Sequence, residues 1–131
     1  MKKVLLDTSG YSRLLKGDKI IQAEIEEASV IYFSVIVVGE LLAAFKNGLH
    51  ETKNKQLLEK FTSKSSVVVI SVTEETADIY AQVVHLLKKQ GTPIPVNDVW
   101  IAAHTIETGA KLITPDGHFS KIPGIRIWDR V

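Results

Sequence analysis

The chain has 131 residues, a length that suits one domain with its own buried core, so we expect residues 1–131 to form a single domain. Its 45% apolar and 24% charged residues are ordinary for a globular protein, and a net charge of +1 gives no overall attraction for nucleic acid. The lack of cysteine excludes thiol nucleophiles, thiolate zinc sites and disulfide bonds.

The chain begins with a short apolar run that ends at Asp7, and this run is too short for a signal peptide. The longest apolar stretch, around residues 30–44, is interrupted by Ser34, Gly39 and Glu40, which excludes a membrane span. We therefore expect a cytoplasmic protein that has no contact with a membrane.

Strand-like and helix-like segments alternate along the chain. Short apolar runs, many rich in β-branched residues, predict strands at residues 4–6, 30–33, 67–70, 111–113 and 125–128. Apolar residues at helical spacing predict helices at residues 19–28, 35–47, 51–64 and 73–90, and a last one that Asn97 or Asp98 caps and Gly109 ends. This alternation predicts an α/β fold of three layers, with a mainly parallel central sheet and helices on both faces.

Three aspartates stand at the ends of predicted elements. Asp7 and Asp116 each follow a predicted strand, and functional sites in parallel sheets gather at that edge. Each aspartate also has a structural interpretation: Asp7 and Asp98 suit helix N-caps, and Asp116 lies in a Pro-Asp-Gly turn. Considered singly, none of the three identifies a site.

Glu40 is more informative because its predicted helix is apolar almost all round, which predicts a largely buried helix. A buried carboxylate needs a cation, a hydrogen-bond partner or a raised pKa. The structural alternative is an ion pair with an arginine or a lysine.

Together, the four acids offer the oxygen ligands that hard divalent cations prefer. Ser9 and Thr114 could supply hydroxyl groups that orient the carboxylates from a second layer. Spacing alone does not show that these residues converge.

Several motifs resemble one known family. They are LDTS at residues 6–9, a helix with Glu40-Leu41, NDVWIAAH at 97–104, GAKLITPDGHF at 109–119 and IPGI at 122–125. This pattern, which extends from Lys3 to about Trp128, resembles the PIN domain and is most similar to the VapC toxins of bacterial and archaeal toxin–antitoxin pairs. One departure is that Pro115 and Gly117 flank Asp116, where the family more often has charged residues.

The resemblance implies a PIN-like nuclease domain that acts as a metal-dependent endoribonuclease. It implies that Asp7, Glu40, Asp98 and Asp116 are the catalytic residues and bind Mg²⁺ or Mn²⁺, with Ser9 and Thr114 in support. An ion of this kind activates a water for attack on the RNA phosphodiester. The resemblance also implies a VapB-like antitoxin as partner, and a homodimer.

Basic residues near the acids are candidates for RNA contact. Arg13 is the closest to Asp7 in sequence and is our choice, while the lysines between residues 46 and 64 suit either a backbone grip or a solvated helix face. The four histidines form no zinc motif, and we expect them to be structural or exposed.

Two other functions are compatible with an aspartate after the first strand. A receiver domain is disfavoured because it needs an aspartate after a central strand, and the run at residues 67–70 is not followed by one. A haloacid-dehalogenase-type phosphatase is disfavoured because it needs a second aspartate two residues after Asp7, where this chain has Ser9. A PIN fold that binds RNA or protein without nuclease activity remains open.

Overall fold

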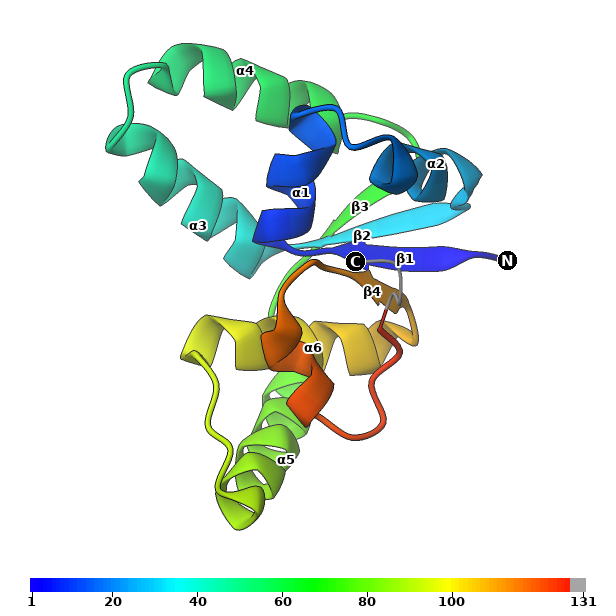
Figure 1. Ribbon diagram of the computed structural model, residues 1–131, viewed down its shortest axis with the longest axis vertical. Coiled ribbons are helices and arrows are strands. Elements are labelled where there is room, and N and C mark those ends of the chain that lie inside the picture. Colours follow the sequence, from blue (N-terminus) through cyan, green and yellow to red (C-terminus); the bar gives the residue numbers. More distant parts are fainter. Residues whose placement is uncertain (128–131) are drawn as a thin grey trace.

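A computed structural model describes residues 1–127, and its centre is a four-stranded parallel sheet (Figure 1). The strands are β1 (Lys3–Leu6), β2 (Val30–Ser34), β3 (Val67–Ile70) and β4 (Lys111–Ile113), in the order β3-β2-β1-β4. Val4 of β1 pairs with Ile31 on one side and with Lys111 on the other. Because β1 is central and covered on both faces, Val4, Leu5 and Leu6 are completely buried.

Within residues 1–127, six helices cover the two faces of this sheet, which confirms the predicted layers. Four of them lie on one face in Figure 1: α1 (Thr8–Leu15), α2 (Lys19–Glu27), α3 (Val35–Lys46) and α4 (Glu51–Thr62). On the other face lie α5 (Glu74–Gln90) and α6 (Val96–Thr108), and a short 3₁₀ helix, η1 (Gly117–Lys121), follows β4. Within residues 1–127, no helix is both long and apolar enough to cross a membrane.

The prediction of a fifth strand at residues 125–128 is wrong for the residues that the structure describes, 125–127. Only an isolated parallel bridge joins Leu112 to Ile127, and the amide of Leu112 donates to the carbonyl of Arg126 at 2.8 Å. Trp128 lies outside the described residues.

The start of the last helix also differs from the prediction. It begins at Val96, directly after Pro95, so neither Asn97 nor Asp98 caps it. The φ angle of proline suits the residues at a helix start, and Asp98 lies in the first turn, where the helix dipole favours a negative charge.

Helix α1 has no counterpart among the predicted helices, because Gly10 and two serines weaken its helical pattern. Three aromatic rings hold it in place: Tyr11 of α1 packs against Phe33 of β2 and Phe61 of α4, with ring centroids 5.2–5.5 Å apart. Gly10 allows α1 to approach β4, since a Cβ atom there would lie 2.6 Å from the carbonyl oxygen of Ile113.

Helix α3 is less buried than predicted. Only Val37 and Leu41 are buried, whereas Val35, Gly39 and Ala43 are exposed. The helix therefore packs through one stripe, although its sequence is apolar on every side.

Candidate metal centre

The four predicted acids line one pocket of about 670 Å³ at the carboxyl edge of the sheet. Asp7 follows β1, and Asp116 comes shortly after β4, the neighbouring strand. Glu40 reaches the pocket from α3, and Asp98 reaches it from the first turn of α6. The structure therefore brings together four carboxylates from four separate elements.

Asp7 is the most deeply buried of these acids, with 4% of its surface exposed. Its carboxylate accepts hydrogen bonds from the amide of Gly10 at 2.7 Å, from Thr114 Oγ1 at 2.5 Å and from Ser9 Oγ at 3.1–3.2 Å. Burial raises the pKa of Asp7 to about 6, although these donors act in the opposite direction. Asp7 is thus both the N-cap of α1 and a rigidly held ligand candidate, and both predicted supporting hydroxyls contact it.

Glu40 is half-buried and is held by two neutral donors. Thr8 Oγ1 donates to its Oε1 at 2.7 Å, and Asn97 Nδ2 donates to its Oε2 at 3.3 Å. Within residues 1–127, Glu40 forms no ion pair with a lysine or an arginine, so the structural alternative considered for it does not apply there.

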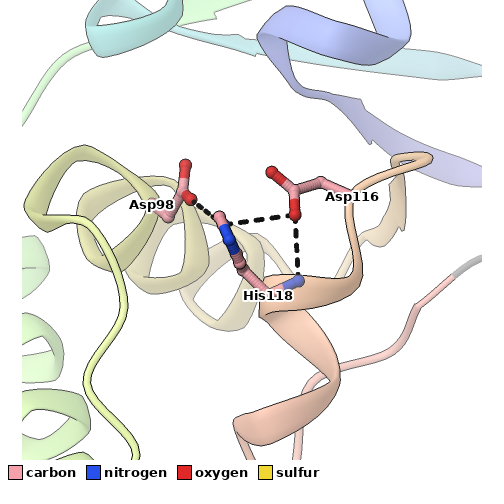
Figure 2. Close-up of side chains that lie close together, drawn as sticks. All are labelled: Asp98, Asp116 and His118. Carbon is pink, nitrogen blue, oxygen red and sulfur yellow. Dashed lines mark hydrogen bonds and ion pairs between the residues drawn. The ribbon is translucent and has the colours of Figure 1, made fainter.

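Asp98 and Asp116 face each other across the ring of His118 (Figure 2). His118 Nδ1 lies 3.0 Å from Asp98 Oδ2 and 3.2 Å from Asp116 Oδ1. Burial raises the pKa of Asp98, and the nearby charges of Asp116 and Glu40 raise it further, while the hydrogen bond to His118 lowers it. Asp116 Oδ1 also accepts a hydrogen bond from the backbone amide of His118 at 2.9 Å. The backbone amide of Asp116 donates a hydrogen bond to Thr114 Oγ1 at 2.9 Å.

The expectation that all four histidines are structural or exposed is therefore too simple. His104 is structural: its completely buried ring contacts Ser34 Oγ at 2.9 Å and the carbonyl oxygen of Ser71 at 3.1 Å. His118, in contrast, contacts Asp98 and Asp116, two of the acids that line the pocket. The sequence signal that was available is its position two residues after Asp116, in a turn tight enough for both side chains to point the same way.

Basic residues reach the same pocket from α1. Arg13 and Lys16 line it beside the acids, which places the predicted RNA-contact residue at the rim of the site. The lysines of the middle helices do not line this pocket: Lys46 pairs with Glu51 at 3.2 Å, and Lys60 and Lys64 line a separate hollow between α1, α2 and α4.

The donor set fits a hard divalent cation. Carboxylate oxygens from four elements converge, and hydroxyl and amide donors fix the orientation of two of them, as is usual around metal ligands. Without a cation, the burial of Asp7 makes its negative charge unfavourable, and a bound cation would offset that cost.

Comparison with known proteins gives concordant matches. Residues 4–125 match the sequence model of the PIN domain. Ribonuclease VapC1 of Haemophilus influenzae strain R2866 is 31% identical over 114 residues, which cover 84% of each chain. The tRNA(fMet)-specific endonuclease VapC of Salmonella typhimurium strain LT2 is 29% identical over 132 residues, which cover 98% of each chain.

Two solved structures are similar over nearly the whole chain. A chain of the DNA-bound VapBC from Salmonella typhimurium superimposes with a TM-score of 0.86 at 28% identity, and 98% of each chain is covered. A chain of VapBC-1 from nontypeable Haemophilus influenzae gives a TM-score of 0.86 at 29% identity, with 97% of each chain covered.

Proposed function

Because this chain belongs to the PIN-domain family and is a VapC-like ribonuclease, we propose that it hydrolyses RNA phosphodiesters in the pocket lined by its four acids. The family predicted from the sequence motifs is confirmed by the match over residues 4–125. The observation that carries the proposal is the convergence of Asp7, Glu40, Asp98 and Asp116 at one edge of the sheet.

The acids would hold one or more Mg²⁺ or Mn²⁺ ions. A bound ion of this kind makes an attacking water more acidic and neutralises the charge that develops on the phosphate. Asp7, fixed by Thr114, Ser9 and Gly10, is the central ligand in this proposal. Glu40 and Asp98 project into the same pocket and would orient the attacking water through their carboxylate oxygens.

The substrate must overcome the repulsion between its phosphates and four carboxylates. Arg13 and Lys16, which lie together at the end of α1, line the pocket and would bind the RNA backbone near the scissile bond. Contacts of this kind release counterions, so RNA affinity should fall as the salt concentration rises. RNA as the substrate also favours a cytoplasmic location.

Cleavage of RNA should require Mg²⁺ or Mn²⁺ and should stop in excess EDTA, because within the described residues the pocket offers no serine–histidine or other protein nucleophile pair in its lining. The measurement is an RNA cleavage assay with tag-free protein, with metal restored after EDTA treatment. Cleavage that persists in EDTA would exclude the metal mechanism. RNA binding without any cleavage would favour the non-catalytic alternative.

We further propose that a VapB-like antitoxin holds the enzyme inactive and that the enzyme self-associates as a homodimer. Structures that resemble the chain include VapBC2 of Rickettsia felis and FitAB, each in complex with DNA. Expression of the chain alone in a bacterial host should slow growth, and Asp7→Asn should relieve this effect at matched protein levels. Equal growth with both proteins would argue that the chain is not a toxin.

A further inference from the structure

Within residues 1–127, His118 is the one histidine that contacts any of the four acids, and its ring offers a nitrogen that could bind a metal ion. Its ring projects from η1 into the space between Asp98 and Asp116 (Figure 2). One donor atom from each of these three residues lies within 4.8 Å of the others. The motifs that identified the family assigned no role to this histidine.

The spacing of these atoms suits metal coordination. An octahedral ion with bonds of about 2.1 Å places neighbouring donor atoms about 3.0 Å apart. His118 Nδ1 lies 3.0 Å from Asp98 Oδ2 and 3.2 Å from Asp116 Oδ1. Both distances from the His118 nitrogen therefore suit an ion that binds His118 next to one of these aspartates.

Local contacts anchor the backbone of His118 beside Asp116 before any ion binds. The amide of His118 donates to Asp116 Oδ1 at 2.9 Å, and the next residue, Phe119, is completely buried. The side chain of His118 keeps 45% of its surface exposed, so the ring is anchored on one side and open to solvent on the other. A ring held in this way is suited to act as a ligand.

We propose that His118 is a direct ligand of the metal ion through Nδ1, beside Asp98 and Asp116, and that it makes the site prefer Mn²⁺ to Mg²⁺. This inference rests on the proposed function. Imidazole nitrogen is a good ligand for transition metals, whereas Mg²⁺ takes oxygen donors and keeps much of its water. Exchanging the imidazole for an oxygen donor should therefore affect Mn²⁺ far more than Mg²⁺.

The test compares tag-free wild type, His118→Gln and a control, His85→Gln, whose histidine is exposed on α5 outside the pocket. Electron spin-echo measurements on the Mn²⁺-loaded proteins detect a nitrogen bound to the ion. Titrations that follow free Mn²⁺, with Mg²⁺ as competitor, give both affinities. Circular dichroism of the metal-free proteins verifies folding.

We expect a nitrogen coupling in wild type and in His85→Gln that disappears in His118→Gln. The Mn²⁺ affinity of His118→Gln should fall by about tenfold or more, with a change in Mg²⁺ affinity below about threefold. A histidine that only positions Asp98 by a hydrogen bond would instead give no nitrogen coupling and parallel losses for both ions.

The outcomes separate this inference from the proposed function. If wild type binds both ions without a nitrogen coupling, and Asp98→Asn abolishes binding, then His118 is not a ligand while the carboxylate site stands. If wild type binds neither ion, the metal site itself is wrong and this inference fails with it.

Discussion

Asp7→Asn should lower the rate of RNA cleavage by at least about a thousandfold, which corresponds to about 4 kcal/mol in activation free energy. Asparagine keeps the oxygen that accepts the amide of Gly10, so α1 retains its N-cap. What is lost is the negative charge at the most buried ligand position. The loss should appear in single-turnover cleavage at saturating RNA, because the substitution removes charge from the proposed metal site and leaves Arg13 and Lys16 intact.

Asp18→Asn is a matched control for this substitution. Asp18 is also a helix N-cap, and its Oδ1 accepts hydrogen bonds from the amides of Ile20 and Ile21 at 3.0 and 3.1 Å. It does not belong to the lining of the acidic pocket. Cleavage by Asp18→Asn should stay within about threefold of wild type, since asparagine caps a helix about as well as aspartate. Equal losses in the two variants would mean that Asp7 acts through the fold rather than through chemistry.

The sequence alone was sufficient to predict the four strands of the sheet. It also predicted that Asp7 and Asp116 lie at the carboxyl edge of that sheet. Apolar runs of β-branched residues identify buried parallel strands, and a parallel sheet brings the residues that follow its strands to one edge. That reasoning placed Asp7 and Asp116. The position of Glu40 depended on the family resemblance, because a helix that is apolar all round does not reveal which of its faces is buried.

The features that the sequence did not reveal depend on contacts between distant segments. Helix α1 is held by the packing of Tyr11 and by the close approach of Gly10 to Ile113, and neither contact leaves a local periodicity. His118 meets Asp98, 20 residues away in sequence, only because η1 folds back toward the start of α6. The position of His118 two residues after Asp116 was the one local signal, and it does not reveal the contact with Asp98.

The same burial that positions Asp7 should destabilise the metal-free protein. The pKa of Asp7 is raised from 3.8 to about 6, a difference worth about 3 kcal/mol when the group is fully ionised. A carboxyl group with a raised folded-state pKa binds more protons in the folded state than in the unfolded state. Stability is therefore lost as the pH climbs from about 4 to about 6, and it stays reduced above that range. The raised pKa of Asp98 has an effect of the same sign.

Asp7→Asn should consequently make the metal-free protein more stable at pH 7.5, by up to about 3 kcal/mol, while removing its activity. The gain should vanish near pH 4, where Asp7 of the folded wild type is already protonated. Millimolar Mg²⁺ or Mn²⁺ should reverse the order: an ion present at about 100 times its Kd stabilises wild type by about 2.7 kcal/mol, and the variant should gain far less. Denaturant unfolding at pH 4, 6 and 7.5, with and without the ion, gives these free energies. If Asp7→Asn were less stable at every pH and kept the full metal-induced gain, Asp7 would be a structural cap outside the metal site.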